Sequence, residues 1–321
     1  MRKILFVVHR YAPFPGGSEN HVRDMAEECV ARGHYAAVFA GEHRGDLNGV
    51  HVTSDANILL DPSWDLIVVH GGDVNVQNFV LSNIDRIPSK VLFVLIRPSD
   101  SQIYDEAIRK CYKVGCCTLE DWDFVKRKNI LHKSVRINYG VDEKNCVGTS
   151  GFREKYNIQT KYMIVSCGGF WPNKAMNELS NIVNEIGRDD MTLVLTGYDN
   201  RHNIIPQETK FVKPIMVEDR NDVMSAIKEA DLYVMHSFSE GFGLVLLESM
   251  LNKTPWAARE IAGAKLMKEF GFTYESDSQL KEYLIDFPTN NKSNLEDAYE
   301  YAILNHSIKV TVNDILKCIE E

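Results

Sequence analysis

The sequence predicts an α/β protein with two Rossmann-like domains that face each other across a cleft. Short apolar segments typical of buried strands alternate with helical segments along the chain, as in a parallel sheet covered on both faces. This alternation pauses once, close to Asp142, and then starts again. A chain of 321 residues is also long for one compact core, so two domains are expected.

The first expected domain begins with a strand, a helix and a second strand. Val22, Met25 and Cys29 lie on one stripe of the helix, and Gly33 ends it as a C-terminal cap. The five strands expected in this domain are Ile4–His9, Ala36–Ala40, Leu66–His70, Val91–Ile96 and Val114–Thr118.

The second expected domain repeats the alternation after a polar stretch that ends at Ser150. We therefore expect domains at residues 1–142 and 143–306, followed by a final helix at residues 307–321. The strands expected in the second domain are Met163–Cys167, Leu193–Thr196, Lys210–Val212, Leu232–His236 and Thr254–Ala258.

Composition excludes several classes of function. A net charge of −9 without a long basic run argues against nucleic-acid binding. No apolar run approaches the roughly 20 residues that span a bilayer, and the N-terminal apolar run is expected to be a strand rather than a signal peptide. The 7 cysteines are scattered, with no Cys-x-x-Cys pair, which favours free thiols and a cytoplasmic protein. The basic cluster Lys126-Arg127-Lys128 is expected to be a solvated helix face, so any membrane contact is at most peripheral.

The segment from Ser239 to Met250 is the strongest functional signal. Glu240 precedes a Gly-Phe-Gly turn, and Glu248 lies on the apolar helix that follows. Gly241 and Gly243 leave the backbone bare where the helix begins, and the first N–H groups of a helix attract phosphate. Carboxylates on either side of a phosphate bound there would suit the hydroxyl groups of a sugar and of a ribose. The alternative is an ordinary glycine turn with solvated glutamates.

Two further glycine loops follow expected strands. Pro15-Gly16-Gly17 comes just before the first helix, and its amides can approach an anion. Gly168-Gly169 follows the first strand of the second domain, and Lys174 beyond it can reach a diphosphate as a point charge. The first loop lacks the Gly-x-Gly-x-x-Gly spacing of dinucleotide sites, which disfavours NAD.

In this order and spacing the chain resembles the GT-B fold retaining glycosyltransferases of family 4, also called group 1. The resemblance covers roughly residues 1–265 and is strongest over 222–265, where Glu240 and Glu248 match the family's Glu-x7-Glu motif. Elsewhere the matching segments are Gly16-Gly17-Ser18-Glu19, Arg32-Gly33-His34 and the hinge-like Asn138-Tyr139-Gly140-Val141-Asp142.

The resemblance implies a role for each matching residue. Glu240 would hold the donor sugar and Glu248 the ribose, while Lys174 would neutralise the leaving diphosphate. The final helix would pack back on the first domain. The catalytic candidates are Glu240, Lys174 and Arg97. The expected donor-binding residues are Gly16, Gly17, Gly169, Lys174, Glu240, Gly241, Phe242, Gly243, Leu244 and Glu248, and the acceptor-side candidates are His70 and Asn20. A structural role for His70 remains the alternative.

The chain departs from the family pattern at two positions. Gly169 stands where the family usually has an arginine, and Arg97 stands where it often has a histidine. We hypothesise that Arg97 partly offsets the missing cation by contacting donor phosphate. The alternative is that Arg97 caps a helix or forms an ion pair in a weakly active enzyme.

The expected function is therefore retaining transfer of a sugar from a nucleotide-diphospho sugar to a hydroxyl of a glycan, lipid or small molecule. No metal or cofactor is expected, because Asp121-Trp122-Asp123 lies at a helix start, where acids favour the helix dipole. Two alternatives remain: a nucleotide-sugar epimerase or hydrolase on the same fold, and a non-catalytic binder of nucleotide sugars or glycans.

Overall fold

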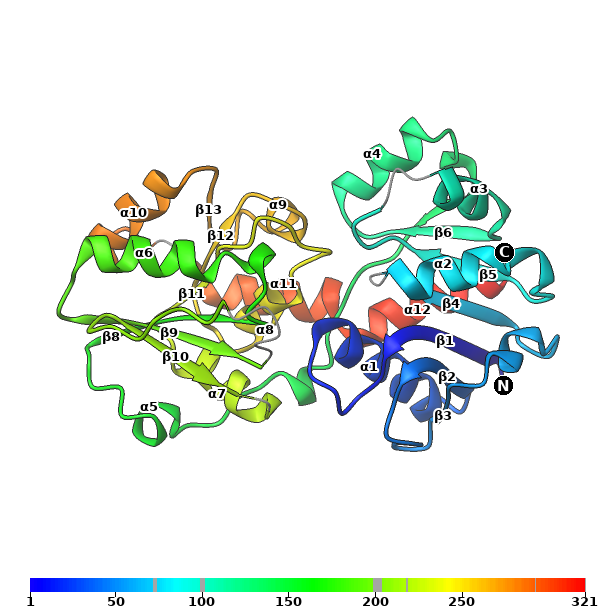
Figure 1. Ribbon diagram of the computed structural model, residues 1–321, viewed down its shortest axis with the longest axis horizontal. Coiled ribbons are helices and arrows are strands. Elements are labelled where there is room, and N and C mark those ends of the chain that lie inside the picture. The colour runs from blue at the N-terminus through cyan, green and yellow to red at the C-terminus, as the bar shows by residue number, and fades with distance from the viewer. Residues whose placement is uncertain (72–73, 99–101, 199–203, 218, 292, 321) are drawn as a thin grey trace. The chain divides into compact units, whose positions relative to one another are not determined.

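The computed structural model describes residues 1–71, 74–98, 102–198, 204–217, 219–291 and 293–320. The chain divides into two compact units, each with a parallel sheet at its centre (Figure 1). Unit 1 comprises Met1–Asp142 and Asn305–Glu321, and unit 2 comprises Glu143–Leu304. In the described residues, no helix is both long and apolar enough to cross a membrane.

The sheet of unit 1 has the strand order β3-β2-β1-β4-β5-β6-β7, and every neighbouring pair is parallel. Its strands are β1 (Lys3–Arg10), β2 (Tyr35–Glu42), β3 (His51–Thr53), β4 (Leu66–His70), β5 (Val91–Val94), β6 (Lys113–Cys116) and β7 (Ser134–Arg136). Its helices are α1 (Gly17–Ala31), α2 (Val74–Ser82), α3 (Gln102–Lys110), α4 (Leu119–Arg127) and α12 (Ile308–Glu320).

The sheet of unit 2 has the order β10-β9-β8-β11-β12-β13 and is also parallel throughout. Its strands are β8 (Tyr162–Cys167), β9 (Met191–Gly197), β10 (Val212–Met216), β11 (Leu232–Met235), β12 (Trp256–Arg259) and β13 (Phe272–Tyr274). Its helices are α5 (Phe152–Lys155), α6 (Met176–Ile186), α7 (Arg220–Glu229), α8 (Leu244–Leu251), α9 (Gly263–Leu266), α10 (Asp277–Asp286) and most of α11 (Leu295–His306).

The expected two-sheet α/β class is confirmed, with corrections at several strands. The segment expected at Lys210–Val212 is a strand at Val212–Met216, and the expected Thr254–Ala258 begins later, at Trp256. Thr118 is not in β6, because its side chain accepts a hydrogen bond from Asp121 N in the capping box of α4. The sequence patterns missed β3, β7 and β13, which have three residues each.

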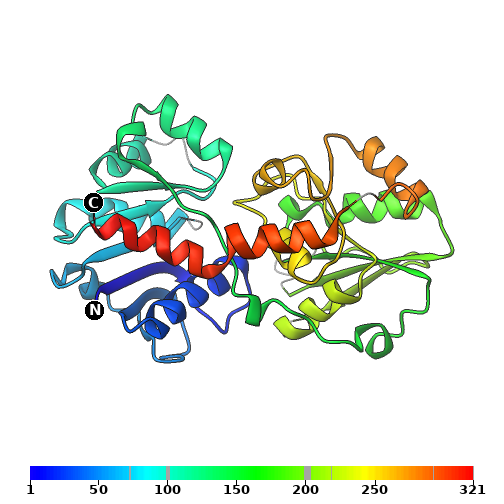
Figure 2. The ribbon, with the colours of Figure 1, turned by 180° about the vertical axis from the view of Figure 1, so that it is seen from behind.

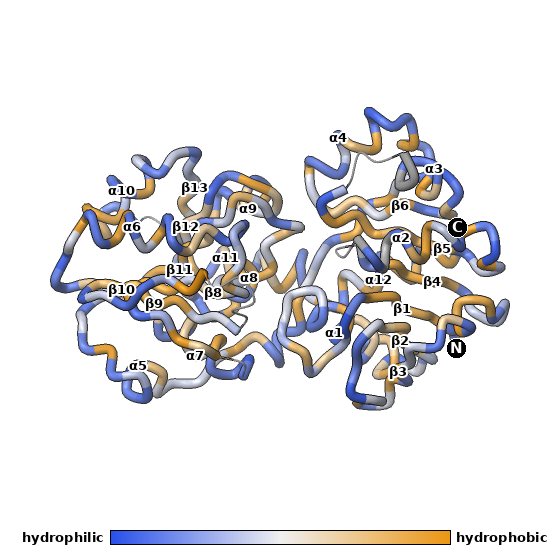
Figure 3. The backbone as a smooth tube through the Cα atoms, in the orientation of Figure 1, coloured by the Kyte–Doolittle hydropathy of each residue, from blue (hydrophilic) through white to orange (hydrophobic). Residues whose placement is uncertain are grey.

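Both sheets bury apolar strands between helical layers. The strands β1, β4, β8, β9 and β11 are predominantly hydrophobic in Figure 3. In unit 1, Ile4 through Val8 are completely buried. In unit 2 the buried hydrophobic core includes Leu193, Leu232 and Tyr274. Strands covered on both faces read as continuous apolar runs, which is why sequence patterning detected them.

The final helix α12 belongs to unit 1 and packs against α1 (Figure 2). Ile308 N donates to Val141 O at 2.9 Å, and the Asn138 amide donates to Asp314 Oδ2 at 2.9 Å. A Cβ atom at Gly140 would lie 2.5 Å from Ser307 O. Glycine is therefore needed where this segment meets the end of the chain.

Candidate active site

Two loops meet at the point where the strand order of unit 2 reverses. β8 lies between β9 and β11, so the chain leaves β8 toward one side and returns at β11 on the other. Ligands of open α/β sheets bind outside the carboxyl ends of the strands at such a switch point. The loop after β8 carries Lys174, and the loop after β11 carries Glu240. Phe238 N donates to Asn173 O at 2.8 Å, which ties the two loops together.

Lys174 and Glu240 form an ion pair across this switch point. Nζ of Lys174 lies 2.7 Å from Oε1 of Glu240. The hydroxyl of Ser237 donates to the same oxygen at 2.6 Å. The side chains are 20% and 12% exposed, so both charges are held in a partly desolvated place. Sequence reasoning chose Lys174 and Glu240 but did not predict that they contact each other.

The Gly-Phe-Gly turn leads directly into α8. Gly243 precedes the helix with a φ of 91°, a conformation that side chains rarely adopt. The carbonyl of Phe242 accepts a hydrogen bond from Gly263 N at 2.9 Å, and the Phe242 side chain is buried. The turn is thereby held in place while Leu244 opens the helix, whose first N–H groups lack partners within it. The partial positive charge of these N–H groups makes the start of α8 a candidate binding place for phosphate.

Glu248 lies one turn further along α8 and is 7% exposed. The Arg220 guanidinium donates to Glu248 Oε1 at 2.7 Å and to Asn145 O at 3.1 Å. Sequence reasoning missed Arg220. A signal existed, because Arg220 is the first residue of α7 after the N-cap Asp219, where the helix dipole disfavours a cation. A cation at that position indicates a nearby anion.

The structure explains why Gly169 carries no side chain. A Cβ atom at Gly169 would lie 2.7 Å from the Trp171 indole. That indole also contacts Tyr198, with ring centroids 6.0 Å apart in an edge arrangement. The aromatic ring thus occupies the space that an arginine at position 169 would need. The adjacent Gly168 has a φ of 143° and packs against the Lys174 side chain.

In unit 1, Gly16 and Gly17 form the start of α1. Gly16 has a φ of 155°, and a Cβ atom there would lie 2.1 Å from the Glu19 carboxylate. Glu19 folds back under this loop, where Arg10 Nη2 approaches it at 2.7 Å and His9 Nε2 at 3.1 Å. Asn20 N donates to Gly16 O at 3.1 Å. Gly17 has open space beside it, so its backbone is approachable.

His70, at the end of β4, belongs to a buried polar cluster rather than to an exposed surface. It is 4% exposed and its Nε2 contacts Nδ1 of His21 at 3.2 Å and the hydroxyl of Tyr139. Burial lowers the pKa of His21 from 6.5 to about 3 and lowers that of His70 well below its ordinary value. Both imidazoles are therefore neutral near pH 7. An acceptor-side role for His70 stays a prediction.

Arg97 follows β5 and is exposed, with a φ of 52° that is uncommon for a non-glycine residue. Within the described part of the chain no ion pair involves Arg97, and the alternative of a helix-capping or ion-paired residue stays a prediction as well. The compensation hypothesis stays a prediction.

Among the residues that the structure describes, no group of three or more histidine, cysteine or acidic side chains is placed so that it could hold a metal ion. Asp121 accepts from the backbone N–H groups of Cys117 and Thr118 at 2.9 and 2.8 Å, which is a capping role. All 7 cysteines are free.

Part of unit 2 matches a known protein family. Residues 161–287, within unit 2, match the family model of glycosyl transferases group 1. No curated protein matches the chain by sequence.

Solved structures match the whole chain at low sequence identity. HepE from Anabaena, in complex with UDP and glucose, is 16% identical with a TM-score of 0.77 and full coverage of both chains. Sucrose-phosphate synthase from Thermosynechococcus elongatus is 14% identical with a TM-score of 0.78, covering 100% of this chain and 98% of that one. A UDP-forming α,α-trehalose-phosphate synthase from Burkholderia xenovorans is 12% identical with a TM-score of 0.79 and full coverage of both chains. The fold is therefore GT-B.

Proposed function

We propose that this protein is a retaining glycosyltransferase. It moves a sugar from a nucleotide-diphospho-sugar donor to a hydroxyl of a glycan, lipid or small-molecule acceptor, without a metal ion or cofactor. The observation that carries the proposal is the contact between Lys174 and Glu240 at the switch point of the unit 2 sheet, followed along the chain by the Gly243 turn that starts α8. A group 1 glycosyltransferase family match over the same unit supports it.

The reaction needs stabilisation of a departing diphosphate. As the bond between the anomeric carbon and the phosphate oxygen breaks, negative charge grows on the diphosphate and positive charge on the sugar. Fixed dipoles and cations placed at the growing negative charge are worth about 3–4 kcal/mol for each donor group. Lys174 supplies the cation, and the N–H groups of Gly243 and Leu244 supply the dipoles.

The configuration at the anomeric carbon is retained if the acceptor attacks from the same face that the diphosphate leaves. The acceptor oxygen forms the new bond to the anomeric carbon, and its proton passes to the departing phosphate oxygen. This route requires no side-chain base. Glu240 holds the hydroxyls of the transferred sugar, and Glu248, positioned by Arg220, holds the ribose. Gly16, Gly17, Asn20 and His70 are proposed to serve the reaction from unit 1.

The donor to test first is a UDP-sugar, because two of the similar structures are a UDP complex and a UDP-forming synthase. A thermal-shift screen of UDP, GDP, ADP, TDP and their sugars identifies the nucleotide. Binding at a hundred times the dissociation constant adds about 2.7 kcal/mol of stability.

Nucleotide release then tests transfer, with and without a panel of acceptors and with EDTA present. Release that depends on an acceptor and survives EDTA supports the proposal. Release without an acceptor indicates a hydrolase, and binding without release indicates a non-catalytic binder. Inversion at the anomeric carbon of the product contradicts retention.

A further inference from the structure

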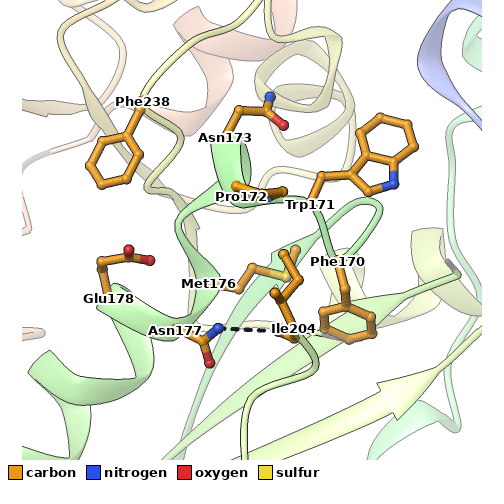
Figure 4. Close-up of a pocket in the computed structure, with 9 residues that line it drawn as sticks. All are labelled: Phe170, Trp171, Pro172, Asn173, Met176, Asn177, Glu178, Ile204 and Phe238. Carbon is orange, nitrogen blue, oxygen red and sulfur yellow. Dashed lines mark hydrogen bonds between the residues drawn. The ribbon is translucent and has the colours of Figure 1, made fainter. Parts of the chain in front are cut away.

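Unit 2 contains a pocket beside the loop that carries Lys174. It is a pocket of about 430 Å³ at the N-terminal end of α6, within the range of about 300–1,000 Å³ typical of small-molecule sites. Phe238 and Glu178 lie on one side of it, and Phe170 and Trp171 lie on the other (Figure 4). Neither the proposed diphosphate nor ribose contacts use this pocket.

Aromatic side chains give the pocket apolar faces. Phe170 is fully buried and forms part of the core of unit 2. Phe238 is 52% exposed, which is unusual for so large an apolar side chain, and the Arg259 guanidinium lies over its ring at 5.1 Å from the centroid. The position of Phe238 is thus set from outside the pocket, and much of its apolar surface remains for a ligand.

Polar side chains are placed among these aromatic groups. Asn177 Nδ2 donates to Ile204 O at 3.1 Å, which fixes the orientation of this exposed amide at the rim of the pocket. Glu178 lines the pocket with a carboxylate, and within the described residues no ion pair involves it. Asn173 completes the polar set.

This combination selects among ligand classes. Glu178 repels an anion such as a phosphate, and Lys174 does not line the pocket. A purely apolar ligand would cover the Glu178 carboxylate without offering it a hydrogen bond. A sugar ring has hydroxyl groups around its edge and apolar C–H faces, so it satisfies carboxylate, amide and aromatic groups together.

We propose that this pocket is a binding subsite for a neutral sugar ring, separate from the donor diphosphate. Asn173 links it to the proposed active site, because its Nδ2 donates to Ser239 O at 3.2 Å and Lys174 is the next residue. A ring bound here contacts the loop that holds the lysine. The subsite goes beyond the proposed transfer reaction, and its occupancy is measurable without turnover.

The test measures binding of methyl glycosides of glucose, galactose, mannose and N-acetylglucosamine by saturation-transfer NMR, with and without saturating UDP. At least one glycoside is expected to bind saturably and to remain bound with UDP present. Phe238→Ala and Glu178→Gln are expected to weaken it by roughly threefold to tenfold. The matched controls are Met216→Ala, which also removes a half-exposed apolar side chain, and Glu282→Gln, which neutralises an exposed acid in the same unit.

The proposal is overturned if no glycoside binds saturably, or if the two pocket variants bind as well as the controls. Preferential binding of tetramethylammonium, lost in Glu178→Gln, would instead identify a cation site. The UDP thermal shift of each variant is expected to match that of the unchanged protein. If UDP fails to bind anywhere while a glycoside still occupies the pocket, the transferase proposal fails and the subsite stands.

Discussion

Nζ of Lys174 lies 2.7 Å from Oε1 of Glu240, although the two residues come from different loops of unit 2. The proposed phosphate-binding cation is therefore already neutralised by the proposed sugar-binding carboxylate. A donor must exchange this contact for its own, so the diphosphate competes with Glu240 for the lysine.

Replacing Glu240 is therefore expected to separate binding from catalysis. Glu240→Gln removes the competing charge, so affinity for free UDP should rise by about threefold to tenfold. Turnover of the sugar donor should fall by about a hundredfold, because the sugar loses its carboxylate partner. Calorimetry with UDP and a nucleotide-release assay measure the two effects. Weaker UDP binding in this variant would contradict the competition.

Gly169→Arg tests the steric role of Trp171. The new side chain would begin 2.7 Å from the indole, so the single variant should lose about 1–3 kcal/mol of stability. The double variant Gly169→Arg with Trp171→Ala should recover part of that loss and bind UDP more tightly, since it adds a cation without the clash. Equal melting temperatures for the single variant and the unchanged protein would show that the indole moves aside freely.

Arg220→Ala is expected to leave the Glu248 carboxylate buried without its guanidinium. The cost should be about 1–3 kcal/mol in the unfolding of unit 2, because an unsatisfied buried group bears its full desolvation penalty. Adding Glu248→Gln should restore most of the stability and none of the nucleotide affinity. Chemical denaturation and UDP titration give both values. A double variant no more stable than the single one would argue against this pairing.

The His21 and His70 pair should make unit 1 sensitive to acid. Because burial lowers the pKa of His21 to about 3 while the unfolded value stays near 6.5, the unfolded chain binds more protons between these values. Stability from His21 is then complete above pH 6.5 and falls with decreasing pH, by up to about 1.4 kcal/mol per pH unit. Burial raises the pKa of Asp121 to about 6, which acts in the opposite direction.

His21→Gln isolates this contribution, since Asp121 is common to both proteins. The pH range between 4 and 6 lies between the folded and unfolded pKa values of His21. Denaturant titrations in this range should show that the free energy of unfolding falls less steeply with decreasing pH in the variant than in the unchanged protein. Parallel pH profiles would rule out a neutral buried His21.

Arg97→Ala tests the remaining departure from the family pattern. If Arg97 compensates for the absent arginine, donor affinity or turnover should fall by about tenfold, the size expected for an exposed charge-assisted contact. Arg97→Lys should retain part of the activity. Unchanged affinity and turnover in Arg97→Ala would exclude compensation, and Arg86→Ala, which alters another cation of unit 1, serves as the control.

The sequence by itself was sufficient to predict two parallel α/β sheets and the positions of their principal strands along the chain, because strands buried on both faces read as continuous apolar runs. The three-residue strands β3, β7 and β13 escaped detection, since such short segments have no periodicity. The sequence also indicated the glycine turns, because the backbone conformation of a turn depends on residues that are neighbours in the chain.

Only the tertiary structure decided which side chains meet. Lys174 and Glu240 are brought together because β8 and β11 are parallel neighbours whose carboxyl ends share one edge of the sheet. The pairing of Arg220 with Glu248, and the filling of the Gly169 site by Trp171, depend on how loops pack in three dimensions. Contacts between residues distant along the chain leave no local pattern, so charge neutralisation and steric exclusion appear only once the strands have placed those loops.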